Sequence, residues 1–124
     1  MPWSVTYRAE SAVVETVFAG LVRPEELRVA FDASMAKGRE FGVTRYLADC
    51  SSLEGGHTIL DLYGLVEILD AIPRSVGFRE AILMPSLDRA AEDVRSYETF
   101  CVNRGLAVRI FGDREKAGPW LTGS

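Results

Sequence analysis

The residues from Thr58 to Ile72 constrain the fold of this chain more than any other segment. Thr58 offers a hydroxyl to the free N–H groups of a first helical turn, and Asp61 stands where a capping box needs an acceptor. Pro73 ends the pattern, because the residue before a proline is disfavoured in the helical region. The segment predicts a helix so apolar that other elements must cover it on more than one side. Its apolar residues are Ile59, Leu60, Leu62, Tyr63, Leu65, Val66, Ile68, Leu69 and Ile72.

A strand and a polar loop precede this helix. Residues 43–50 carry the β-branched and aromatic residues typical of a strand. Residues 51–57 are polar and contain Gly55 and Gly56, which favour a sharp backbone turn. The sequence therefore predicts a strand, a loop and a helix in immediate succession.

Strand and helix patterns alternate through the rest of the chain. Residues 3–8 and 12–19 are separated by a short polar step and predict a hairpin. The other predicted elements are a helix from Pro24 that fades at Gly38 or soon after, a strand at 79–85, a helix capped by Ser86 or Asp88 and ended by Gly105, a strand at 106–111, and a short last helix after Asp113.

This order predicts an α/β fold in a single domain that covers residues 1–124. An opening β-hairpin is followed by βαβαβα units, which favour a five-stranded mixed sheet with sequential strand order. Because crossovers between parallel strands are right-handed, sequential strands place the helices mainly on one face of the sheet. The opposite face is then expected to stay uncovered.

Each strand after the first carries one charge within an apolar alternation, and we expect these charges on the uncovered face. Apolar residues of the same predicted alternation favour self-association as a homodimer, because a two-fold interface buries such a patch against itself. The predicted charges are Glu15, Arg45, Glu80 and Arg109, and the predicted apolar residues are Val17, Leu47, Ile82 and Phe111.

Composition limits the possible functions. The formal net charge is −4 and the basic residues are scattered, which argues against nucleic acid as a partner. No apolar run approaches the roughly 20 residues of a membrane span, and the first residues lack the features of a signal peptide, so we expect a cytoplasmic protein. Cys50 and Cys101 are expected to be buried, reduced thiols, and the sequence predicts neither a metal site nor a cofactor.

The chain resembles the STAS family, the domain of bacterial anti-sigma-factor antagonists, and within it the SpoIIAA-like group, which is distantly similar to Sec14-type lipid-binding domains. The resemblance covers nearly the whole chain and rests on the element order and on three motifs. These are the strand Tyr46-Leu47-Ala48-Asp49, the serine-containing loop into the helix at Thr58, and Val108-Arg109-Ile110-Phe111 followed by Ala117, Trp120 and Leu121.

The resemblance implies a phosphorylatable serine just before the second helix. The family's Asp-Ser-Ser-Gly-like motif is absent, and Glu54-Gly55-Gly56-His57 stands in its place. The candidate hydroxyls are those of Thr58, Ser52 and Ser51.

Three functions are compatible with the sequence. The first is a non-catalytic regulatory or protein-interaction module that binds a partner through loop 51–58 and the helix after it. The alternative is a domain that binds a small apolar, lipid-like ligand beneath that helix. A third possibility is an enzyme that uses Asp49, Cys50 and His57 at the carboxyl end of a parallel strand, although no recognised nucleophile spacing accompanies them. The predicted ligand or partner surface consists of Asp49, His57, Leu60, Tyr63, Ile68 and Phe78.

Overall fold

The computed structural model describes residues 2–123. The elements, in chain order, are β1 (Trp3–Arg8), β2 (Val13–Leu21), α1 (Pro24–Phe41), β3 (Arg45–Gly55), α2 (Ile59–Asp70), a 3₁₀ turn (Arg74–Val76), β4 (Arg79–Leu83), α3 (Asp88–Asn103), β5 (Ala107–Phe111) and α4 (Arg114–Thr122).

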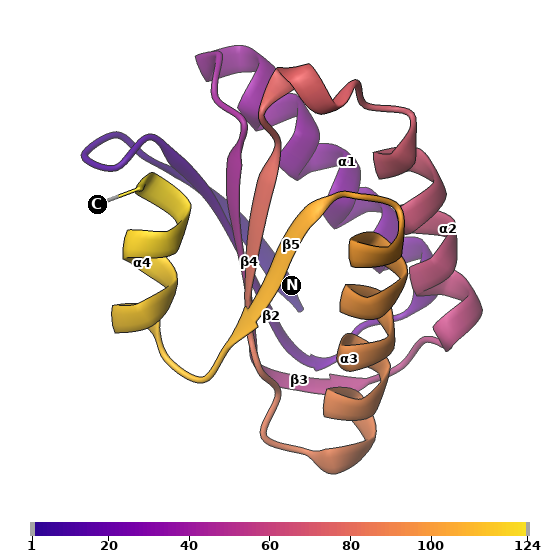
Figure 1. Cartoon of the computed structure of the whole chain (residues 1–124). Helices are drawn as coiled ribbons and strands as arrows, with labels where there is room; N and C mark the ends of the chain where they lie inside the picture. The colour runs from indigo at the N-terminus through magenta and orange to yellow at the C-terminus, as the bar shows by residue number, and fades with distance from the viewer. Residues whose placement is uncertain (1, 124) are drawn as a thin grey trace.

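The strands form one mixed sheet in the order β1-β2-β3-β4-β5 (Figure 1). β1 and β2 are antiparallel, and each later pair is parallel. The predicted α/β class, the sequential order and the opening hairpin are confirmed. The parallel order follows from the alternation of strand and helix, since only a crossover can return the chain to a parallel neighbour.

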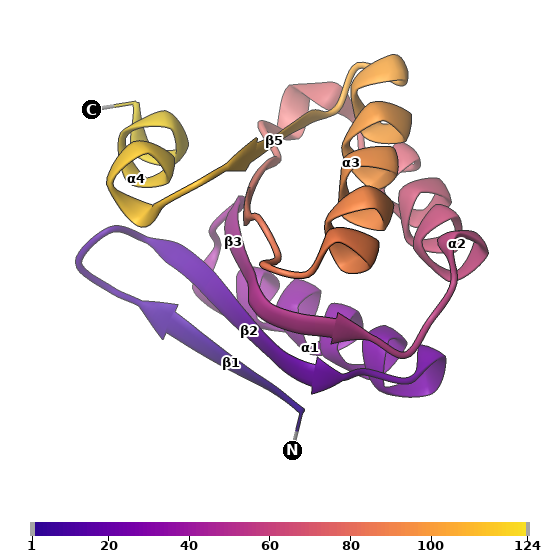
Figure 2. The ribbon, with the colours of Figure 1, turned by 90° about the horizontal axis from the view of Figure 1, so that it is seen from below.

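Three helices cover one face of the sheet and one covers the other. α1, α2 and α3 lie together on one side, and α4 lies alone on the opposite side (Figures 1 and 2). The larger core is therefore beneath α1, α2 and α3, and a smaller core lies beneath α4. The helices are mainly on one face, as predicted.

The expectation that the opposite face is uncovered is wrong. α4 places Ala117 and Leu121 against Leu47, Ala81 and Leu83, and all five residues are buried. Trp120 also packs near Phe111, with ring centroids 5.6 Å apart. α4 thus covers, within one chain, the apolar face from which the homodimer was predicted. Self-association stays a prediction, but this face no longer supports it.

The face assigned to β4 is also wrong. Ile82 belongs to the larger core, and Glu80 contacts Tyr97 of α3, so both side chains point toward the helices. Arg79, Ala81 and Leu83 occupy the α4 side instead. Glu15, in contrast, lies on the α4 side as expected, because its carboxylate binds Arg114 of α4.

The end of α1 agrees with the prediction, but one helix cap and one strand end do not. α1 ends at Phe41, soon after Gly38, and Gly42 follows it in the left-handed conformation. The N-cap of α3 is Leu87, which makes no side-chain hydrogen bond, so neither Ser86 nor Asp88 caps this helix. Gly38 allows the close approach of Tyr46, whose hydroxyl would overlap a Cβ atom at that position. β3 extends to Gly55, so residues 51–55 form a strand rather than a loop.

The turn between β3 and α2 depends on Gly56. A Cβ atom on Gly56 would lie 2.7 Å from the Val22 nitrogen, and φ at Gly56 is +100°. The Val22 N–H also donates a hydrogen bond to the Gly55 carbonyl (2.8 Å). The sharp turn predicted from the paired glycines is therefore confirmed, and it holds the start of α2 near the start of α1.

Candidate functional site

A largely apolar cavity lies between the sheet and helices α1, α2 and α3. Its volume, counted as the space that the centre of a water molecule can occupy, is about 70 Å³. One water needs roughly 10–15 Å³ by this measure, so the cavity has room for several waters or a short organic chain. Both the strands and the three helices contribute apolar lining residues, among them Phe18, Met35, Ala48, Leu62, Ile82 and Val94.

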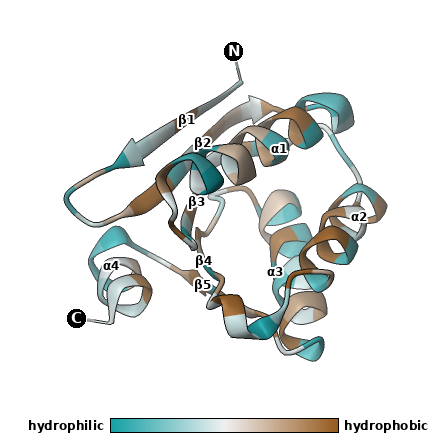
Figure 3. Ribbon diagram, turned by 90° about the horizontal axis from the view of Figure 1, so that it is seen from above, coloured by the Kyte–Doolittle hydropathy of each residue, from teal (hydrophilic) through white to brown (hydrophobic). Residues whose placement is uncertain are grey.

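α2 forms the outer wall of this cavity. Its backbone lies nearest to α3 and α1, and no strand of the described chain lies as close to it. Leu62 and Leu65 of α2 nevertheless point inward, since both are buried and line the cavity. Figures 2 and 3 show the three helices on the same side of the strands, with hydrophobic residues along α2. The buried apolar side of α2 thus faces the cavity, which the side chains of the protein do not fill completely.

Among the residues of the range 2–123 that line the cavity, Glu80 is the one carboxylate. The Tyr97 hydroxyl donates a hydrogen bond to its Oε1 atom (2.7 Å). Burial raises the pKa of Glu80 to about 7, and the hydrogen bond from Tyr97 only partly offsets that rise. Burial together with the neighbouring Glu80 raises the pKa of Tyr97 well above its ordinary value, so Tyr97 keeps its proton. The site therefore holds an acid that titrates near neutral pH.

Three other polar residues of the lining, Thr16, Ser34 and His57, make hydrogen bonds within the protein. Ser34 donates a hydrogen bond to the Ala30 carbonyl (2.9 Å), so the hydroxyl of Thr16 is the donor in the Thr16–Ser34 contact. His57 Nδ1 lies 2.9 Å from the Val22 carbonyl oxygen and donates to it, since a carbonyl only accepts. These groups fix the walls of the cavity.

The three residues of the enzyme hypothesis, Asp49, Cys50 and His57, do not form one site. Cys50 and His57 both line the cavity, but no hydrogen bond joins them within residues 2–123. Asp49 faces the opposite side of the sheet, where it binds Arg114. Burial raises the pKa of the Cys50 thiol far above its ordinary value, and the thiolate needed for nucleophilic attack is disfavoured. Asp49, Cys50 and His57 thus do not form the paired nucleophile and base of covalent catalysis.

The cysteines are free and buried, as predicted. Burial raises the pKa of Cys101 to about 12. Both thiols therefore act as small apolar core groups.

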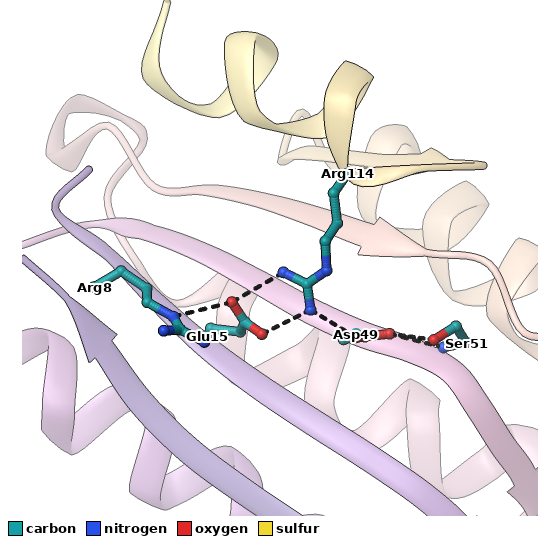
Figure 4. A network of polar contacts seen from close by, with 5 residues as sticks. All are labelled: Arg8, Glu15, Asp49, Ser51 and Arg114. Carbon is teal, nitrogen blue, oxygen red and sulfur yellow. Dashed lines mark hydrogen bonds and ion pairs between the residues drawn. The ribbon is translucent and has the colours of Figure 1, made fainter. Parts of the chain in front are cut away.

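Arg114 of α4 joins two carboxylates on the other face of the sheet (Figure 4). Its guanidinium donates to both oxygens of Glu15 (3.1 and 2.7 Å) and to Asp49 Oδ2 (2.7 Å). The hydrogen bonds from Arg114 lower the pKa of Glu15 against the effect of burial. Burial acts to raise the pKa of Asp49, but hydrogen bonds from Ser51 and Arg114 outweigh it and the net change is a decrease. The network therefore attaches α4 to β2 and β3 by fixed charges.

The three candidate hydroxyls have different environments. Thr58 is the N-cap of α2, and its capping box with Asp61 is confirmed: the Asp61 carboxylate accepts from the Thr58 N–H (2.7 Å). The Ser51 hydroxyl donates to Asp49 (2.6 Å). Ser52 is exposed on β3. All three side chains are exposed, and two of them already have a carboxylate as partner.

The residues of the predicted ligand or partner surface lie in different places, and Asp49 is on the other face of the sheet. His57 and Phe78 line the cavity. Tyr63 packs edge-on against Phe100 (5.3 Å between centroids), and Ile68 is half-buried. Leu60 is 77% exposed and faces away from the cavity. The structure therefore brings together only part of this set.

No pattern in the sequence predicted that Glu80 and Tyr97 are hydrogen-bond partners. Tyr97 belongs to the apolar stripe predicted for the third helix, and a buried tyrosine hydroxyl needs a hydrogen-bond partner. That requirement is the signal that could have placed a polar group of the sheet beneath Tyr97.

Within residues 2–123, no group of three or more His, Cys, Asp or Glu side chains is arranged to hold a metal ion. In the same range no helix has both the length and the apolar character needed to cross a membrane.

These features define a SpoIIAA-like α/β fold with a cavity beneath its main helix layer. The chain is similar to the crystal structure of an uncharacterized protein of the DUF3478 family, with a SpoIIAA-like fold, from Shewanella loihica PV-4. The two share 14% sequence identity with a TM-score of 0.57, and the match covers 96% of this chain and 91% of that chain. No family model and no curated protein matches this sequence. The similarity establishes the fold alone.

Proposed function

We propose that this protein binds a small apolar molecule in the cavity between the sheet and helices α1, α2 and α3. The observation that supports this proposal is the cavity itself, with about 70 Å³ of open space and walls that are mostly hydrophobic. Protein cores are normally close-packed, and ligand sites are concave, mostly apolar and fitted with few polar groups.

The position of α2 supports the same proposal. A helix whose nearest neighbours are other helices is able to shift outward without breaking strand hydrogen bonds. The confirmed cap at Thr58 keeps its first turn formed during such a shift. The ligand would contact Leu62 and Leu65 on α2 and Ala48 on β3.

Native mass spectrometry of the full chain purified from its host tests the proposal. We expect an additional small mass that is lost on denaturation. The cavity-filling variant Ala48→Leu should lose this mass, because Ala48 is 9% exposed and lines the cavity. The matched variant Ala36→Leu adds the same atoms to an exposed position of α1 and should keep it. A clean mass for the wild type in every preparation would contradict ligand binding.

A second candidate is the regulatory or protein-interaction module that acts through residues 51–58 and α2. The observation that favours it is Leu60, which is 77% exposed in the first turn of α2, directly after the cap at Thr58. The hydroxyls of Ser51 and Ser52 are also exposed. A phosphate on Thr58 would stand beside Asp61 and weaken the cap, whereas a phosphate on Ser52 would disturb no hydrogen bond of its side chain. Phosphoproteomics of the host under several growth conditions tests this candidate. The absence of phosphate on Ser51, Ser52 and Thr58 would count against regulation by phosphorylation.

A further inference from the structure

One oxygen of Glu80 has no partner within the described residues. Oε1 accepts from Tyr97, and no other hydrogen bond or ion pair to Glu80 occurs in residues 2–123. In the same range no fully enclosed side-chain oxygen lacks a hydrogen-bond partner, so Oε2 of Glu80 keeps accessible surface. Since Glu80 lines the cavity, Oε2 is an acceptor available to a molecule inside it.

The cavity is poorly suited to an anionic ligand. In the part of the chain that the structure describes, the lining contains no lysine or arginine, and its one histidine already donates to the Val22 carbonyl. A carboxylate or phosphate in this space would be desolvated beside Glu80 without a neutralising cation. The chemistry of the lining therefore favours a head group that donates a hydrogen bond to a carboxylate oxygen.

We propose that the cavity selects apolar molecules that carry a hydrogen-bond donor, such as a primary alcohol, and that the donor binds Oε2 of Glu80. Tyr97 is a positioning residue in this arrangement, because its hydrogen bond to Oε1 fixes the orientation of the carboxyl group. The apolar part of the ligand lies against Leu62, Leu65 and Val94. This inference rests on the proposed function and specifies the class of ligand.

Two isomeric probes separate hydrogen-bond donation from apolar burial. n-Hexanol and methyl pentyl ether contain the same atoms, but only the alcohol donates a hydrogen bond. Each is titrated into the full-length protein at about pH 8, where Glu80 is mostly ionised. Binding is followed by the NMR shifts of the methyl groups of Leu62, Leu65 and Val94, and the methyl groups of exposed Leu60 serve as the internal reference.

We expect the wild type to bind n-hexanol about tenfold more tightly than the ether, as is typical for a hydrogen bond to a charged acceptor. Glu80→Gln should reduce this preference to about threefold or less, since an amide also donates to an ether oxygen. Glu67→Gln, an exposed position on α2, should leave the preference unchanged.

The outcomes distinguish the two proposals. Equal binding of the two probes to the wild type would overturn the head-group inference and leave apolar binding intact. A preference that persists in Glu80→Gln would overturn the role of Glu80. Binding of neither probe at the cavity methyl groups would overturn both proposals.

Discussion

Replacement of Glu80 by glutamine should make the protein more stable at alkaline pH but not at acidic pH. Glu80 has a pKa of about 7 in the folded chain, against an ordinary value of 4.5. Between these values the unfolded chain releases the proton while the folded chain holds it, so the free energy of unfolding of the wild type falls as pH rises. One pH unit of difference corresponds to about 1.4 kcal/mol, and the total loss is therefore about 3 kcal/mol.

The glutamine variant cannot ionise, but it keeps an oxygen that accepts from Tyr97. We expect the two proteins to have similar stability near pH 4.5 and the variant to be more stable by about 3 kcal/mol above pH 7. Besides Tyr97, the titratable groups that the Glu80 charge affects are Tyr46, Cys50 and Cys101. Burial raises the pKa of each, so they stay neutral across this range.

Urea unfolding followed by circular dichroism at a series of pH values measures the difference between the two proteins. Glu67→Gln provides the control, because Glu67 is exposed. In Tyr97→Phe the pH dependence should move to higher pH, since the hydrogen bond from Tyr97 lowers the pKa of Glu80. A stability difference between wild type and Glu80→Gln that stays constant from about pH 5 to about pH 8 would refute this account of Glu80.

Two further predictions concern the other face of the sheet and the packing of α1. Arg114→Gln should lower the free energy of unfolding by about 2 kcal/mol at neutral pH, a loss moderated by the half-exposed guanidinium. Arg114→Gln should also move the midpoint of acid unfolding to higher pH. In the wild type, the lowered pKa of Glu15 contributes stability above pH 4.5, and this stability is lost as pH falls through the folded-state pKa. An unchanged acid midpoint in the variant would contradict this role of Arg114. Gly38→Ala should destabilise the protein by about 1–3 kcal/mol, because the new Cβ atom overlaps the Tyr46 hydroxyl. Gly64→Ala should stabilise the protein by about 0.5–1 kcal/mol, because a Cβ atom at this position of α2 meets no other atom. Equal changes in melting temperature for the two alanine variants would rule out the overlap at Gly38.

Local signals in the sequence were sufficient to predict the order of elements and the strand order. The cap at Thr58 with Asp61 depends on residues three positions apart, and the structure contains it. The sequential sheet order follows from strand and helix alternation, because right-handed crossovers leave few alternatives. Both predictions use patterns of residues that are close in sequence, together with a general rule for crossovers.

The face of α4 could not be predicted in the same way. The handedness rule applies to a helix between two parallel strands, and in the described chain no strand follows α4. Its position depends on Arg114 and Glu15, which are 99 residues apart in sequence. A charged residue at the start of a short helix gives no indication of so distant a partner.

The orientation of β4 was ambiguous for a different reason. Residues 78, 80 and 82 form one alternating set and residues 79, 81 and 83 form the other, and each set contains two apolar residues and one charge. Hydrophobic alternation therefore cannot decide which set faces the larger core. The charge that enters this core, Glu80, is the residue on which the proposed ligand selectivity depends.

Glu15 and Glu80 are carboxylates on opposite faces of one sheet, and their partners account for their different chemistry. Glu15 binds the cation of Arg114, and its pKa falls despite burial. Within residues 2–123, Glu80 has only the neutral hydroxyl of Tyr97 as a partner, and burial raises its pKa. A paired carboxylate stabilises the fold at neutral pH, whereas a buried carboxylate without a cation destabilises it once ionised. A bound molecule that donates a hydrogen bond to Glu80 would reduce this cost, so ligand binding should stabilise the wild type more than Glu80→Gln at about pH 8.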